Sequence, residues 1–118
     1  MSVPSDLPVW QELKAHHAAI ADLHLRDLFA ADPARFSIFS RRFGDLLVDF
    51  SKHRITGETL GLLIELARQA QVPAWIERTF GGEMINHTER RSVLHVALRN
   101  RSDRPILVNG ADVMPGVN

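Results

Sequence analysis

Helix start and stop signals divide this chain into short helical stretches. Pro8, Asp32-Pro33, Thr56 and Pro73 each precede apolar residues at helical spacing. Asp and Thr cap helix amino termini, and proline fits the first helical turn. Gly44 and Gly81-Gly82 are typical helix ends. The pattern therefore predicts a mainly α fold.

Apolar stripes predict which residues face the core. In the first helix the spacing of three and four places two histidines, His17 and His24, on the stripe, with His16 beside it. The helix between 32 and 44 is expected to align three phenylalanines. The stripe residues of these two helices and of the one after Thr56 are Trp10, Leu13, His17, Ile20 and His24; Phe36, Phe39 and Phe43; and Leu60, Leu63, Ile64 and Ala67.

One or two short strands are expected among the helices. Leu46–Ser51 alternates in the manner of a strand. Ile106–Val108 followed by Asn109-Gly110 predicts a strand that enters a turn, with Val113-Met114 as the returning segment. An isolated two-stranded ribbon is only marginally stable. We therefore expect this chain to be the front of a larger protein.

Composition and charge exclude several classes of protein. The 118 residues suffice for one core, and 14 basic residues balance 14 acidic ones. Zero net charge argues against a dedicated nucleic-acid or membrane-surface binder. The absence of cysteine excludes disulfides and thiolate metal sites. Without a secretory signal or a bilayer-length apolar run, we expect a cytoplasmic protein.

No local motif predicts a catalytic, cofactor or metal site. His17 and His24 would stand two turns apart, ~10.5 Å along a helix, whereas metal pairs need a spacing of three or four. The glutamates are scattered, and Gly81-Gly82-Glu83 lacks a phosphate-loop pattern. Hydrogen-bonded core histidines and a helix end are the preferred interpretations.

The basic segment from 89 to 104 leaves two interpretations open. A helix from Thr88-Glu89 to about Asn100 would place Arg91, His95 and Arg99 on one face, beside Arg101 and Arg104. Like charges at this spacing repel, so something should offset them. Either the arginines of a structural helix pair with carboxylates or carbonyls, or the face binds phosphate or nucleic acid. No aromatic residue interleaves them to stack on bases.

Several blocks of sequence after about Trp10, in one register, carry a family resemblance. They read His24-Leu25-Arg26-Asp27-Leu28-Phe29, Asp32-Pro33-x-Arg35-Phe36, Asp49-Phe50-Ser51-Lys52-x-Arg54-Ile55-Thr56, Gly82-Glu83-x-Ile85-Asn86-x-Thr88-Glu89-x-Arg91, Val93-Leu94-His95-Val96-Ala97-Leu98-Arg99-Asn100-Arg101-Ser102 and Asp112-Val113-Met114-Pro115-x-Val117-Asn118. This pattern resembles the amino-terminal region of the glucose-6-phosphate isomerase (phosphoglucose isomerase) family. The chain departs from the family at His53, Met84, Ser92 and Gly116, none of them a catalytic position of the family.

The resemblance implies an aldose–ketose isomerase of glycolysis and gluconeogenesis. Such enzymes interconvert glucose 6-phosphate and fructose 6-phosphate through a cis-enediol, with a glutamate base and no metal or cofactor. They are homodimers of sugar-isomerase (SIS-type) α/β domains. The family's catalytic residues lie downstream of the matched blocks. Residues 1–118 are thus expected to form a single amino-terminal helical segment without catalytic residues, inactive alone and without the catalytic α/β domains.

Another class of function remains open beside this one. The chain could be an autonomous helical interaction module that associates, with itself or with a partner, through the apolar stripes of its helices. Exposed apolar patches promote such association.

Overall fold

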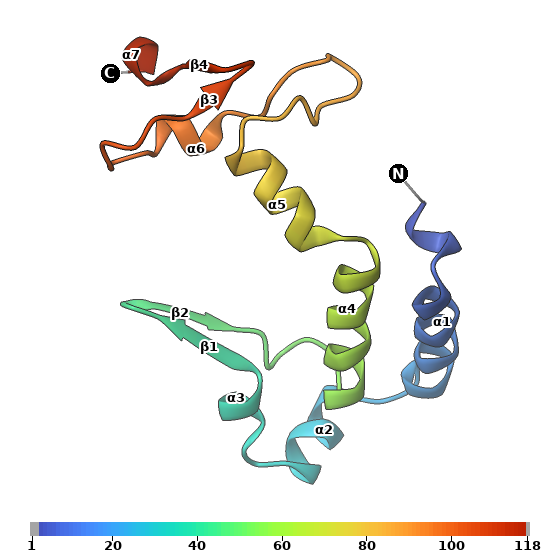
Figure 1. Cartoon of the computed structure of the whole chain (residues 1–118). Helices are drawn as coiled ribbons and strands as arrows, with labels where there is room; N and C mark the ends of the chain where they lie inside the picture. Colours follow the sequence, from blue (N-terminus) through green and yellow to red (C-terminus); the bar gives the residue numbers. More distant parts are fainter. Residues whose placement is uncertain (1–2, 118) are drawn as a thin grey trace. The chain divides into compact units, whose positions relative to one another are not determined.

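The computed structural model describes residues 3–117, which belong to two compact units, Met1–Ala70 and Gln71–Asn118. Figure 1 labels the helices and strands of both units. The first unit contains a short 3₁₀ helix (Pro4–Asp6), α1 (Pro8–Ile20), α2 (Leu25–Ala31), α3 (Arg35–Ile38), β1 (Ser40–Phe43), β2 (Leu46–Asp49) and α4 (Gly57–Gln69). The second unit contains α5 (Val72–Phe80), α6 (His95–Leu98), β3 (Leu107–Val108), β4 (Ala111–Asp112) and α7 (Met114–Val117).

An antiparallel pair of helices, α1 and α4, lies side by side in the first unit (Figure 1). At one end the Val9 N–H donates to Gln69 Oε1 over 3.1 Å, and at the other His16 Nε2 is 2.5 Å from Thr59 Oγ1. Val9 is fully buried in this contact. The packing is thus fixed by polar contacts at both ends and an apolar residue at one of them.

The predicted start of α4 is confirmed. Thr56 is its N-cap, and Thr56 and Thr59 form a reciprocal capping box. The Thr59 N–H donates to Thr56 Oγ1 over 3.4 Å, and the Thr56 N–H donates to Thr59 Oγ1 over 2.9 Å. Glu58 lies in the first turn, where a negative charge interacts favourably with the helix dipole.

The prediction of one helix from Pro8 through His24 is wrong. Helix α1 ends at Ile20, and His24 instead caps the separate helix α2. Its Nδ1 accepts the Arg26 N–H over 3.1 Å. The His24 side chain thus hydrogen-bonds a backbone N–H two residues further along the chain. Such local bonds, which short polar side chains also make, compete with the backbone hydrogen bonds that would continue the helix.

The prediction of a helix between 32 and 44 is also wrong. Helix α3 covers only Arg35–Ile38, and the chain then forms an antiparallel hairpin in which Phe43 pairs with Leu46. The loop residue Gly44 has a φ of 57°, a left-handed value that glycine adopts without steric cost. Phe36 lies in α3, Phe39 directly follows it and Phe43 ends β1, so the three phenylalanines do not line one helix. The predicted strand is confirmed for Leu46–Asp49.

A buried arginine, Arg35, anchors the loop between β2 and α4. It is only 3% exposed, and its Nε, Nη1 and Nη2 donate to the carbonyls of Ser51, Ile55 and His53 over 2.8, 2.8 and 2.6 Å. Its Cζ lies 4.5 Å from the ring centre of Phe39, close enough for a cation–π interaction. The guanidinium therefore gives each of the three loop carbonyls a donor, and the His53 carbonyl also accepts the Ile55 N–H over 2.8 Å.

The same loop begins with an exposed carboxylate turn. Asp49 Oδ1 accepts the Ser51 hydroxyl over 2.7 Å and the Ser51 N–H over 2.9 Å. These two bonds, the hydroxyl first, lower the pKa of Asp49 because they stabilise the ionised form. Ser51 is buried, so this turn fixes the chain where it enters the Arg35 contact.

In the second unit the predicted Asn109-Gly110 turn is confirmed. Both residues have positive φ, 52° and 80°, as a type I′ hairpin requires, and Leu107 pairs with Asp112. The returning strand is Ala111–Asp112 rather than Val113-Met114. The Val113 N–H still donates to the Ile106 carbonyl over 2.9 Å, so the pairing extends one step beyond the strands.

The predicted helix α5 is confirmed, and Gly82 shows why glycines follow it. Gly82 has a φ of 75°, and a Cβ there would collide with the carbonyl oxygen of Leu107. The Ser92 hydroxyl donates to the Gly82 carbonyl over 2.6 Å. Glycine at 82 thus allows β3 to approach the end of α5 closely.

The prediction of a helix from Thr88 to about Asn100 is wrong except for its last turn, α6. Asn86 and Arg91 form a backbone bridge around a tight turn, and Arg90 has a φ of 54°. Asn86 Oδ1 accepts the Glu89 N–H over 3.2 Å. Asparagine often closes turns in this way. The segment therefore forms a turn, although the spacing of its residues is also compatible with a helix.

The fold class is confirmed as mainly helical, although the described residues form two two-stranded hairpins where one or two short strands were predicted. Among residues 3–117 the buried apolar side chains are Val9, Phe39, Ala97 and Met114. Many large apolar side chains are exposed, most of all Phe43 at 85%. None of the helices in the described part of the chain is long and apolar enough to span a membrane.

Replacing the anchor by Arg35→Met should lower the free energy of unfolding by about 3 kcal/mol, because one buried and two partly buried hydrogen bonds to loop carbonyls are lost. Urea denaturation measures this loss. Arg42→Met, at an exposed arginine of β1, is the matched control and should change it by less than about 0.5 kcal/mol. Equal effects of the two substitutions would show that Arg35 does not anchor the loop.

Replacing Ser51 by alanine should raise the pKa of Asp49 toward its ordinary value. The lowered pKa means that the turn stabilises the fold above the pKa of the unfolded chain and loses this effect as pH falls through the folded value. An NMR titration of the Asp49 carboxyl in wild type and Ser51→Ala measures the shift. An unchanged midpoint would refute the assigned cause, with Ser37→Ala as the control.

Candidate functional site

A depression in the second unit brings together most of the predicted basic residues. It has a volume of about 670 Å³ and is lined by residues from the end of α5, from α6 and from the loop that follows α6. We call it the basic hollow, and its defining residues are Phe80, His95, Arg99, Arg101, Arg104 and Ile106.

Asn100 shapes the loop that carries the arginines. Its Nδ2 donates to the Arg104 carbonyl over 2.9 Å, and its Oδ1 accepts the Ser102 N–H over 3.0 Å and the Ser102 hydroxyl over 2.6 Å. One side chain therefore closes residues 100–104 into a tight turn. This is why Arg101 and Arg104, three positions apart without a helix, line the same depression as Arg99.

The charge of the basic hollow is not balanced within the described part of the chain. Its lining contains three arginines and no carboxylate. The ion pairs found among residues 3–117 join other residues: His16 with Glu58, Arg68 with Glu65, and Arg78 with Glu83. The arginines of the hollow are exposed, so water solvates them in this chain. The arrangement suits a partner that carries negative charge.

The predicted basic face is therefore formed only in part. His95, Arg99, Arg101 and Arg104 do line one depression. Arg91 does not belong to it, because the Asn86–Arg91 bridge places this residue before the short helix α6. The predicted four-residue spacing needed a continuous helix, and the turn at Arg90 interrupts it.

Sequence reasoning missed the aromatic residue of the hollow. Phe80, at the end of α5, contributes an apolar surface that is 63% exposed. No aromatic residue interleaves the arginines along the chain, and none was expected beside them. Only the tertiary contact between the end of α5 and the 99–106 loop brings Phe80 there, so no local spacing could have revealed it.

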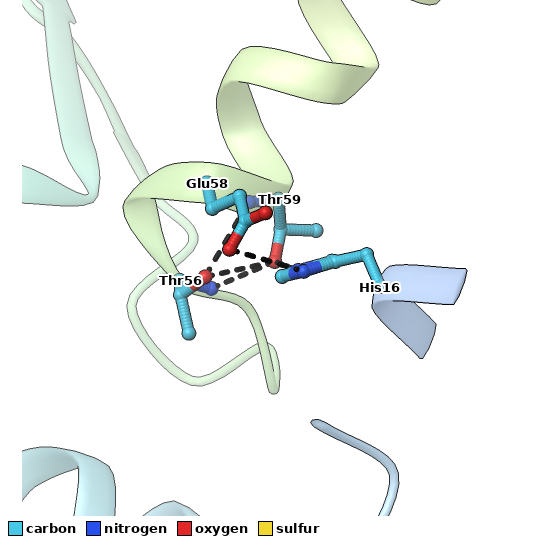
Figure 2. Close-up of polar contacts among 4 residues, drawn as sticks. All are labelled: His16, Thr56, Glu58 and Thr59. Carbon is cyan, nitrogen blue, oxygen red and sulfur yellow. Dashed lines mark hydrogen bonds and ion pairs between the residues drawn. The ribbon is translucent and has the colours of Figure 1, made fainter. Parts of the chain in front are cut away.

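A second polar cluster joins α1 to the start of α4 (Figure 2). His16 is 7% exposed, and its Nε2 contacts Thr59 Oγ1 while its Nδ1 lies 3.5 Å from Glu58 Oε2. Thr59 also belongs to the capping box with Thr56. The cluster thus connects the capping of one helix to the packing of the other.

The predicted placement of the histidines needs correction. His17, expected on the buried stripe, is exposed, whereas His16 is the buried residue. His24 is an exposed cap of α2. The buried residues of α1, Val9 and His16, each come one position before the predicted stripe residues Trp10 and His17, and His16 contacts Thr59 of α4. Among residues 3–117 no group of three potential metal ligands comes together.

The comparison with known proteins defines the class. The model of the phosphoglucose isomerase family matches residues 49–118, more than half of the sequence. The chain therefore belongs to the phosphoglucose isomerase family, and the resemblance recognised in its sequence is confirmed.

Two curated relatives show to which particular protein of this family the chain is similar. The chain is 57% identical, over all 118 residues, to the glucose-6-phosphate isomerase of Methylococcus capsulatus. It is also 57% identical over its full length to glucose-6-phosphate isomerase 1 of Chromobacterium violaceum. The chain spans 22% of the length of each relative.

Replacing His16 by phenylalanine should lower the free energy of unfolding by about 1–2 kcal/mol, because the buried Thr59 hydroxyl loses a hydrogen-bond partner. His17→Phe, one residue away on the exposed side, should change it by less than about 0.5 kcal/mol. Urea denaturation of the two variants compares them. If His17→Phe lowered the free energy of unfolding more than His16→Phe, the burial of His16 rather than His17 would be contradicted.

Proposed function

We propose that this chain is the amino-terminal part of a glucose-6-phosphate isomerase, an aldose–ketose isomerase that interconverts glucose 6-phosphate and fructose 6-phosphate. The observation that carries the proposal is the 57% identity to two such enzymes along the entire chain. The family resemblance implies a cis-enediol route and a place in glycolysis and gluconeogenesis.

Within this enzyme, residues 1–118 serve as one structural segment and supply no catalytic group. The catalytic α/β domains of sugar-isomerase type, which bind the sugar phosphate, belong to the polypeptide outside this region. The whole enzyme acts as a cytoplasmic homodimer without metal or cofactor, and it binds neither nucleic acid nor membranes. The balanced charge of the chain supports the last two points.

The pattern of exposure supports a structural role. The strand β2 is exposed along its whole length, and Phe43, Leu46 and Val48 share one face of the hairpin. Exposed apolar patches of this kind usually mark a surface that another part of a protein covers. Among the described residues, more large apolar side chains are exposed than buried.

A chimera tests the proposal directly. The segment of the Methylococcus capsulatus enzyme that matches this chain is replaced by residues 1–118, and the product is purified from a host lacking its own isomerase. We expect the chimera to convert fructose 6-phosphate to glucose 6-phosphate in a coupled dehydrogenase assay. The 118-residue chain alone should give no turnover, because it contributes no catalytic residue.

The unmodified relative is the positive control, and a version lacking the matched segment is the negative control. A chimera that folds but does not turn over would contradict the proposal, as would turnover by the chain alone. The exposed β2 face also favours an autonomous interaction module. That function predicts a folded but inactive chimera, so the same assay separates the two.

A further inference from the structure

We infer that the basic hollow is a docking surface for an acidic segment of the remaining isomerase polypeptide, one that presents carboxylates around an apolar side chain. This inference rests on the proposed function, because it takes the partner to be the rest of that enzyme. It adds the surface and the chemistry by which the two parts recognise each other.

Charge is the first argument for an acidic partner. Arg99, Arg101 and Arg104 face one depression whose lining has no carboxylate, in a chain whose net charge is zero. Arginine side chains bind carboxylates through two parallel hydrogen bonds, and such pairs are strong where water is excluded. The hollow thus concentrates positive charge that the described part of the chain does not neutralise.

The apolar part of the lining is the second argument, and it disfavours a free anion. Phe80 and Ile106 line the same depression as the arginines. A phosphate ion would pair with the guanidinium groups but would leave these apolar side chains in water. An apolar side chain flanked by carboxylates would cover both kinds of surface. Arginine and aromatic residues are also the types enriched at the centres of protein interfaces.

The length of the relatives indicates which polypeptide could bind in the basic hollow. The chain spans 22% of each matched isomerase, so most of the polypeptide of these enzymes lies outside the matched part. That polypeptide is present at high effective concentration whenever it is covalently linked to this segment. It is therefore a better occupant than a second copy, which must bind from solution.

Charge reversal in two contexts tests the inference. Arg101→Glu and Arg104→Glu are introduced separately into the isolated chain and into the chimera described above. Because both side chains are exposed and no ion pair to either is found among residues 3–117, the melting temperature of the isolated chain should stay unchanged. In the chimera each substitution should lower the melting temperature by several degrees, because it sets a glutamate against the partner's carboxylates.

Arg26→Glu is the matched control, since Arg26 is an exposed arginine of α2 outside the hollow. It should leave both melting temperatures unchanged, and Arg101→Lys should recover part of the loss in the chimera because it restores the charge. The wild-type chimera separates the two proposals. Its inactivity would count against the proposed function, whereas the melting temperatures of the variants report on docking.

Three results would overturn the inference. The first is a chimera whose melting temperature does not respond to reversal at Arg101 or Arg104. The second is stabilisation of the chimera by millimolar inorganic phosphate that Arg101→Glu abolishes, which would show a small-anion site. The third is dimerisation of the isolated chain, seen by light scattering and abolished by Arg101→Glu, which would make a second copy the occupant.

Discussion

The contact on which the first unit depends is the burial of one guanidinium group. Arg35 donates to the carbonyls of Ser51, His53 and Ile55, and so fixes the loop that connects β2 to α4. That loop ends at Thr56, the cap of α4, against which α1 packs. The partners are backbone carbonyls, so the departure from the family pattern at His53 leaves the contact available.

The arginines of this chain have opposite roles, and burial decides between them. Arg35 is buried, where an unpaired charge would be costly, and its donors are satisfied by carbonyls while its face meets Phe39. The arginines of the basic hollow are exposed, so water stabilises them and they remain available for a partner. Arg35 holds the first unit together, and the exposed arginines suit the docking contact that we propose for the basic hollow.

Local signals predicted structure well where one physical cause dominated. The Thr56 cap, the proline start of α5 and the Asn109-Gly110 turn each depend on a few adjacent residues, and each was confirmed. Prediction failed where a helical spacing of apolar residues continued across a turn. The spacing of Phe36, Phe39 and Phe43 suggested one helix, but the chain leaves the helix at Phe39, and Gly44 turns a hairpin instead of ending a helix. The basic segment failed similarly, because the turn at Arg90 interrupts the period.

The sequence by itself determined the family, the mainly helical class and the residue types available to the basic hollow. The family could be recognised because its sequence blocks follow one another in the same order and spacing along the chain, which needs no tertiary information. Tertiary structure decided that His16 rather than His17 is buried, that Arg35 is an anchor, and that Phe80 lies beside the arginines. Each of these depends on residues far apart in sequence, whose approach is set by the packing of whole elements and not by local spacing.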